Sequence, residues 1–111
     1  METKDNQVGG DHYKKGIKYD IGKPEYNLIP PLAENEVVKV LTVGAKKYSP
    51  ENWRLIDDIP VRYMNAALRH INLHRSGEQL DEETGLSHLA HAICCLQFIL
   101  ENQLIKQDEQ N

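Results

Sequence analysis

Apolar residues recur every three or four positions along three stretches of the chain, the spacing that places them on one face of an α-helix. The first stretch follows Pro30 and Pro31, and the second follows Asp58 and Pro60. The third follows an acidic, glycine-containing connector and runs almost to the C-terminus. The pattern therefore predicts helices near residues 32–48, 59–76 and 84–106.

The residues that flank these stretches predict where each helix begins and ends. Ser49-Pro50 would end the first helix. Asp58 or Ile59 would cap the second, with Pro60 in its first turn, and Ser76-Gly77 would end it. Thr84 is a suitable N-cap for the third helix.

The fold class that follows is all-α. We expect a small helical bundle of three main helices with an irregular Pro/Gly-rich N-terminal segment, because no stretch has the pattern of a strand. The 111 residues suffice for one domain, which we place at residues 18–106 between an N-terminal arm (1–17) and a polar tail (107–111). Only 6% of the residues are aromatic, so the core is thin. A thin core favours a homo-oligomer, a dimer or a tetramer.

Charge and targeting signals narrow the classes of partner. The net charge of −4 argues against direct DNA binding and against binding to an anionic membrane. No apolar run approaches the roughly 18 residues that span a bilayer, and residues 1–10 contain no hydrophobic segment of a signal peptide. Cys94 and Cys95 are adjacent, so we expect buried thiols in a reducing cytoplasm rather than a disulfide framework.

Histidines and acids gather between residues 69 and 95, which hold four of the five histidines. The histidines form two pairs at helical spacing, four and three residues apart, and the acids lie in the connector between the pairs. Two helices joined by this connector would gather imidazoles and carboxylates into a divalent-metal or acid–base site. The alternative is that the histidines lie at solvent edges and the acids stabilise the positive N-terminus of the third helix. The residues concerned are His70, His74, His88 and His91, with Glu78, Asp81, Glu82 and Glu83.

A second cluster follows the first predicted helix. Tyr48 or Trp53 could stack a nucleobase, Asn52 could read its edge, and neighbouring cations, Lys46 and Lys47, could hold phosphates. The alternative is a helix C-terminus with its favoured lysines, followed by a loop whose Trp fills the core.

Two features near the N-terminus are candidate anion or subunit contacts. Lys23 lies in a loop centred on Gly22 that could present N–H and ammonium groups to an anion, or could be an ordinary turn. The string VGGDHYKKG could wrap a phosphate or cover a neighbouring subunit, or could be a solvated tail.

Several stretches together resemble a known family. KYDIGKPEYNLIPP, LTVGAKKYSPENW, RYMNAALRH and SGEQLDEETGLSHLAHAICC resemble the phage dATP/dGTP diphosphohydrolases, which are similar to the all-α MazG-like nucleotide pyrophosphohydrolases. The resemblance runs from about Lys18 to Leu100. It implies that pyrophosphate is removed from a purine deoxynucleoside triphosphate to leave the monophosphate in host-cell cytoplasm. It also implies a divalent cation, usually Mg²⁺, bound by carboxylates.

The sequence departs from the MazG-like metal pattern, which has Glu-x-x-Glu on one helix and Glu-x-x-Asp on the next. Only Glu78-x-x-Asp81 is present, and histidines stand in place of the other acids. The resemblance makes Mg²⁺ the first expectation. Because histidine ligands favour Mn²⁺, Co²⁺ or Zn²⁺ over Mg²⁺, we keep Mn²⁺ or Co²⁺ as alternatives. The predicted metal ligands are Glu78, Asp81, Glu82 and His88. The predicted catalytic residues are Glu78, Asp81 and His91, and the predicted substrate contacts are Lys23, Lys46, Lys47, Tyr48, Asn52, Trp53, Arg69 and His70.

Three functions are compatible with these residues. The first is metal-dependent hydrolysis of dGTP or dATP. The second is a non-catalytic protein that sequesters a nucleotide or cyclic nucleotide, which the incomplete acidic motif keeps open. The third is a structural adaptor whose histidines are surface residues.

Overall fold

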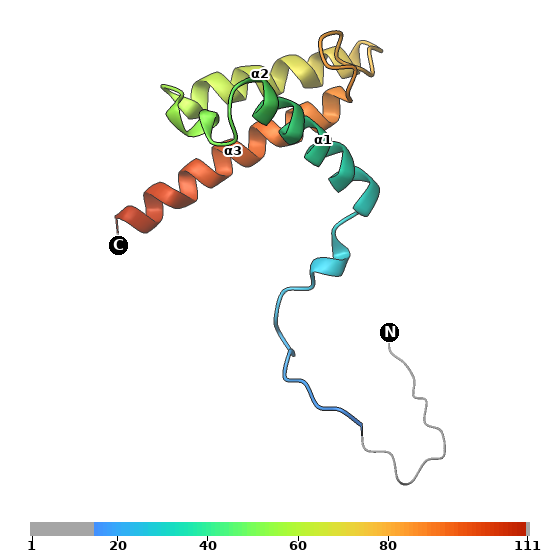
Figure 1. Cartoon of the computed structure of the whole chain (residues 1–111), viewed down its shortest axis with the longest axis vertical. Helices are drawn as coiled ribbons and strands as arrows, with labels where there is room; N and C mark the ends of the chain where they lie inside the picture. The colour runs from blue at the N-terminus through green and yellow to red at the C-terminus, as the bar shows by residue number, and fades with distance from the viewer. Residues whose placement is uncertain (1–14, 111) are drawn as a thin grey trace.

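The computed structural model describes residues 15–110 and shows three α-helices with two short 3₁₀ helices (Figure 1). Within that range there is no β-strand, and pairing is limited to an isolated bridge between Leu80 and Ser87. The predicted all-α fold is therefore confirmed. The elements in chain order are η2 (Tyr26–Leu28), α1 (Pro31–Lys47), η3 (Asn52–Leu55), α2 (Ile59–Arg75) and α3 (His88–Glu109).

The body of the molecule is a pair of helices with a third laid across it. α2 and α3 are joined by residues 76–87 and pack side by side, and α1 crosses α3 (Figure 1). The contact between α1 and α3 is made by Val37 and Val40 on one helix and Ala90 and Cys94 on the other. These side chains are small, so the core buries little apolar surface, in agreement with the thin core expected from the few aromatic residues.

α1 and α2 lie within one residue of their predicted limits. α1 begins at Pro31, where the missing N–H costs nothing because the first helical N–H groups have no partner in the helix. α2 begins after Asp58, whose side chain makes no capping hydrogen bond and whose φ is +55°. The chain leaves α2 through Gly77, where φ is +105°, a conformation that glycine adopts without steric cost.

α3 begins at His88 and not near residue 84, so the prediction that Thr84 caps this helix was wrong. The cap is Ser87, whose hydroxyl accepts a 3.2 Å hydrogen bond from the N–H of Ala90. The connector before it is a tight loop in which the Asp81 N–H donates to the Leu86 carbonyl at 2.7 Å. α3 also runs to Glu109, past its predicted end, because no glycine or proline interrupts it.

The segment before α1 extends away from the body (Figure 1). Its apolar side chains are largely in solvent, with Ile17 78%, Tyr19 83% and Ile21 100% exposed. A turn at Gly22 is closed by a 3.1 Å hydrogen bond from the Lys23 N–H to the Asp20 carbonyl. The candidate motif at residues 8–16 lies almost entirely outside the described residues. No helix among residues 15–110 is long and apolar enough to cross a membrane.

Candidate functional site

The packing of α2 on α3 brings three of the predicted histidines together. His70 comes from α2, and His88 and His91 come from the first turn of α3. The Nδ1 atoms of His70 and His88 are 2.9 Å apart. The rings of His70 and His91 are stacked, with centroids 4.5 Å apart and planes 11° from parallel. His74 is not part of this cluster.

Two acids of the connector complete the cluster. The Glu78 carboxylate lies 2.7 Å from Nε2 of the fully buried His88. Asp81 joins His70 and His88 in a group whose three candidate ligand atoms all lie within 4.8 Å of one another. Histidine nitrogens and carboxylate oxygens bind a zinc-like divalent metal ion at roughly 2.0–2.2 Å. Two ligand atoms of one metal ion are therefore at most roughly 4.4 Å apart. The three side chains are therefore close to a metal-binding geometry.

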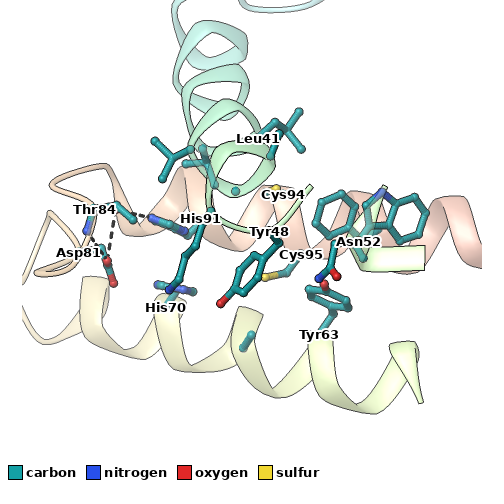
Figure 2. Close-up of a pocket in the computed structure, with 18 of the residues that line it drawn as sticks. Leu41, Tyr48, Asn52, Tyr63, His70, Asp81, Thr84, His91, Cys94 and Cys95 are labelled. Carbon is teal, nitrogen blue, oxygen red and sulfur yellow. Dashed lines mark hydrogen bonds between the residues drawn. The ribbon is translucent and has the colours of Figure 1, made fainter. Parts of the chain in front are cut away.

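Thr84 fixes the Asp81 carboxylate and links it to His91 (Figure 2). One Asp81 oxygen accepts hydrogen bonds from the N–H groups of Glu83 and Thr84, at 3.1 and 2.9 Å, and from the Thr84 hydroxyl at 3.2 Å. The same hydroxyl lies 2.8 Å from Nε2 of His91. Sequence reasoning gave Thr84 the wrong role. The available signal was an Asp in a loop, since Asp side chains often accept the backbone N–H two residues on, as Asp81 does from Glu83.

Burial and neighbouring charges set the protonation of the cluster. Desolvation, reinforced by His91, lowers the pKa of His70 to about 4, and desolvation also lowers the pKa of His91. Burial tends to raise the pKa of Asp81, but hydrogen bonds from Thr84 and the nearby His91 outweigh it, so this pKa is lowered. At neutral pH the cluster therefore offers unprotonated His70 and His91 rings beside an ionised carboxylate, as a cation requires.

The acids of the connector precede α3, with Glu78 against His88 at the start of that helix and Asp81 near the same residue. The first turn of α3 contains no acidic residue, and the helix dipole acts mainly within the first turn. Glu83 pairs instead with Lys47 at the end of α1.

The cluster lies at one end of a pocket of about 1140 Å³ between the C-terminal part of α1, η3, α2 and α3. Figure 2 shows His70, His91, Asp81 and Thr84 at one end, Asn52 and Tyr63 at the other, and Tyr48 between them. The pocket volume is slightly above the usual range for small-molecule sites, roughly 300–1,000 Å³. Sequence reasoning did not include Tyr63, which faces the pocket.

Aromatic rings form the far wall of the pocket. Trp53 is stacked on Phe98, with centroids 4.7 Å apart and planes 10° from parallel, and the Arg54 guanidinium lies 4.7 Å from the Trp53 ring centre. Tyr63 meets Phe98 edge-on at 5.2 Å. Trp53 is therefore already packed, which agrees with the alternative that it fills the core, while Tyr48 remains 63% exposed.

Two predicted cations line the pocket, Lys47 and Arg69. The hydrogen bond and charge of Glu83 raise the pKa of Lys47, which stays protonated. Lys46 and Glu82 are exposed and do not line the pocket. Lys23 lies in the segment that extends from the opposite end of α1 (Figure 1).

The two cysteines are free thiols on the α3 side of the pocket. Burial raises the pKa of Cys94 to about 12 and also raises that of Cys95. Both thiols are therefore protonated at neutral pH and contribute packing rather than a nucleophile.

Fold and site together define an all-α protein with a histidine–carboxylate cluster at one end of a partly aromatic pocket. The family model described as "dATP/dGTP diphosphohydrolase, N-terminal" matches residues 13–111, and the chain belongs to this family. A protein named "dATP/dGTP diphosphohydrolase" from Salmonella phage PMBT28 is 42% identical over 85 residues, which cover 76% of this chain and 28% of the relative. The chain thus spans little more than a quarter of that relative. No solved structure matches it.

Proposed function

We propose that the chain hydrolyses a purine deoxynucleoside triphosphate, dATP or dGTP, to the monophosphate and pyrophosphate with the help of a divalent cation. The observation that carries the proposal is the His70–Asp81–His88 group. Its members His70 and Asp81 line one end of a pocket whose other end is aromatic, and His88 is buried behind them. That arrangement suits the phosphates and the base of one nucleotide. The name of the phage relative supports the same substrate class.

We assign the cation to His70, Asp81 and His88, since their ligand atoms are already within 4.8 Å. This differs from the ligands expected from sequence, because Glu78 bonds His88 and Glu82 is exposed. Two imidazoles and one carboxylate suit Mn²⁺, Co²⁺ or Zn²⁺ better than Mg²⁺. A cation held there supplies charge that offsets the phosphates and favours attack by water.

Glu78 is a positioning residue in this proposal. Its carboxylate lies 2.7 Å from Nε2 of His88 and accepts that N–H, which leaves the lone pair on Nδ1 facing His70. A carboxylate behind a ligating histidine orients the ring and raises its basicity. Since His88 is fully buried, Glu78 also gives its ring a polar partner.

The remaining chemistry belongs to groups that line the pocket. Lys47 and Arg69 line the pocket and would bind phosphate oxygens of the substrate. Lys47 would then break its ion pair with Glu83 and pair with a phosphate instead. His91 is unprotonated at neutral pH because its pKa is lowered, so it is suited to accept a proton from the attacking water. Asn52 at the other end and Tyr48 between the two ends would contact the base.

Product analysis tests the proposal directly. Each of the four deoxynucleoside triphosphates is incubated with the protein and Mn²⁺, Co²⁺ or Mg²⁺, and products are resolved by anion-exchange chromatography. We expect dGMP or dAMP together with pyrophosphate, and no deoxynucleoside diphosphate. Nucleotide that is bound but recovered intact would instead establish a sequestering protein, and absence of both binding and turnover would exclude either role.

A further inference from the structure

The Thr84 hydroxyl in the connector has three hydrogen-bonding partners. Figure 2 shows two of them, Nε2 of His91 at 2.8 Å and the carboxylate oxygen Oδ2 of Asp81 at 3.2 Å. The third is the backbone N–H of Leu86, whose nitrogen lies 3.2 Å from the same hydroxyl oxygen. A hydroxyl has one hydrogen to donate and two lone pairs that accept. Three partners therefore use its whole capacity, and the position of each hydrogen follows.

Two of the three partners have only one possible role. The Leu86 N–H donates, so it occupies one lone pair of the hydroxyl. Asp81 is ionised at neutral pH, as carboxylates that accept several hydrogen bonds are, and an ionised carboxylate only accepts. Asp81 therefore takes the hydroxyl hydrogen. One lone pair of Thr84 remains for His91, so Nε2 of His91 must carry a hydrogen and donate it.

The opposite tautomer of His91 would break this network. A bare Nε2 would need the hydroxyl hydrogen, and the Thr84 oxygen would then face Oδ2 of Asp81 with no hydrogen between them. Lone pairs of two oxygens, one of them anionic, would meet at 3.2 Å. The two side chains are partly buried, where water screens an unfavourable polar contact poorly. The Nε2–H tautomer avoids this contact and satisfies every group.

In that tautomer the lone pair of His91 is on Nδ1. No group within residues 15–110 forms a hydrogen bond with this atom, and His91 lines the pocket. Stacking on His70, with ring planes 11° from parallel, fixes the plane of the ring. The Thr84 hydroxyl fixes the rotation of the ring within that plane. Nδ1 is thus the ring nitrogen that is free to accept a proton, and its direction is fixed.

The network also separates the two oxygens of Asp81. The hydrogen bonds from the N–H groups of Glu83 and Thr84 and from the Thr84 hydroxyl all end on Oδ2. In the described part of the chain Oδ1 accepts none, so it is the oxygen available to a cation. A cation bound through Oδ1 leaves the link from Asp81 through Thr84 to His91 intact.

We propose that Thr84 is a positioning residue that keeps His91 in the Nε2–H tautomer, so that Nδ1 takes the proton of the attacking water. This role of Thr84 rests on the proposed hydrolysis of a nucleoside triphosphate. The water oxygen bonds to the attacked phosphorus as the bond from that phosphorus to its bridging oxygen breaks. The leaving group keeps the electron pair of the broken bond, and a water proton moves to Nδ1. The hydroxyl then connects the positive imidazolium to the Asp81 carboxylate, which stabilises it.

NMR of the metal-free protein tests the hydrogen arrangement without substrate. Two-bond nitrogen–hydrogen correlation spectra of isotope-labelled histidines at neutral pH separate a protonated ring nitrogen from a bare one. In the wild-type chain and in Thr84→Ser, we expect His91 to have a bare Nδ1 and an Nε2–H that is protected from exchange with water. Thr84→Val should lose this protection. The matched control is Thr42→Val, which removes a hydroxyl bonded to the Val38 carbonyl at 2.7 Å and should leave the His91 signals unchanged.

Two spectroscopic results would overturn the assignment. One is a neutral His91 ring that carries its hydrogen on Nδ1 in the wild-type chain. The other is an Nε2–H that stays protected in Thr84→Val. Where Thr84→Val does not fold, the wild-type spectrum still decides the first result.

Kinetics test the role in catalysis separately. At saturating Mn²⁺, Thr84→Val should lower kcat about 10–100-fold, since a general base contributes about 10²–10⁴-fold and only its orientation is lost. KM for the nucleotide should change little, and Thr84→Ser should recover most of the rate. A wild-type kcat in Thr84→Val would refute the positioning role. Absence of turnover in the wild-type chain would refute the proposed function instead, and the spectra would still decide the hydrogens of Thr84 and His91.

Discussion

Replacing Asp81 by Asn separates the metal-binding role of this residue from its structural role. One Asp81 oxygen accepts three hydrogen bonds, at 2.9, 3.1 and 3.2 Å, and the amide oxygen of Asn can accept the same three. The variant therefore loses the negative charge of the carboxylate and keeps its three hydrogen bonds. Hydrogen bonds to charged groups are worth about 1.5–3 kcal/mol and neutral ones about 0.5–1.5. After solvent screening of a partly exposed carboxylate, we expect a loss of about 1 kcal/mol in the free energy of unfolding.

The effect of the same change on the cation should be larger. Loss of a group that only orients a ligand typically lowers metal affinity 10–100-fold, so loss of the one anionic ligand should lower it at least about 100-fold. Isothermal titration with Mn²⁺ measures the affinity, pyrophosphate release measures the rate, and urea unfolding of metal-free protein measures the stability. We expect turnover to fall by about the same factor at a fixed Mn²⁺ concentration well below the wild-type dissociation constant.

Glu82→Gln is the matched control, because it removes the same charge one residue away on an exposed side chain. It should retain wild-type affinity for Mn²⁺ and the wild-type rate. Wild-type Mn²⁺ affinity and rate in Asp81→Asn would refute the ligand assignment. Loss of activity in both variants would point to the overall charge of the connector instead.

Three further outcomes follow from the site. Glu78→Gln should lower Mn²⁺ affinity 10–100-fold in titrations, since it weakens the orientation of His88, whereas unchanged affinity would remove Glu78 from this role. Lys47→Ala should raise KM for the nucleotide about tenfold or more through loss of a charge-assisted phosphate contact, and an unaltered KM would exclude Lys47 from the phosphate site. Burial lowers the pKa of His70 to about 4, so the unfolded chain binds its proton first as the pH falls below the ordinary value of about 6.5. Urea unfolding of metal-free protein should therefore show up to about 2 kcal/mol of stability lost between pH 6.5 and 4 after allowing for screening, and His70→Gln should remove that part of the loss.

The helices could be predicted from sequence because their signals are local. The apolar spacing and the flanking Pro31, Pro50 and Gly77 placed α1 and α2 within one residue. The start of α3 was missed because Thr84 and Ser87 are both suitable caps. Hydrogen bonds across the connector, such as that from the Asp81 N–H to the Leu86 carbonyl, decide between them.

The composition of the site could be predicted, but the arrangement of its members could not. Helical spacing indicated that His70 would lie near His88 and His91. Nothing in the spacing showed that Glu78 would bond to a histidine while Glu82 faced solvent, because the path of a loop depends on tertiary contacts. The same holds for the predicted phosphate-binding cations. Lys47 lines the pocket, whereas Lys46, one residue earlier, does not.

A crystal structure with Mn²⁺ and a non-hydrolysable dGTP analogue tests the central claim most directly. The account predicts an anomalous peak within about 2.0–2.3 Å of ligand atoms from His70, Asp81 and His88. It also predicts the triphosphate beside that peak and the base toward Asn52 and Tyr48. A peak at Glu82, or nucleotide bound outside this pocket, would contradict it.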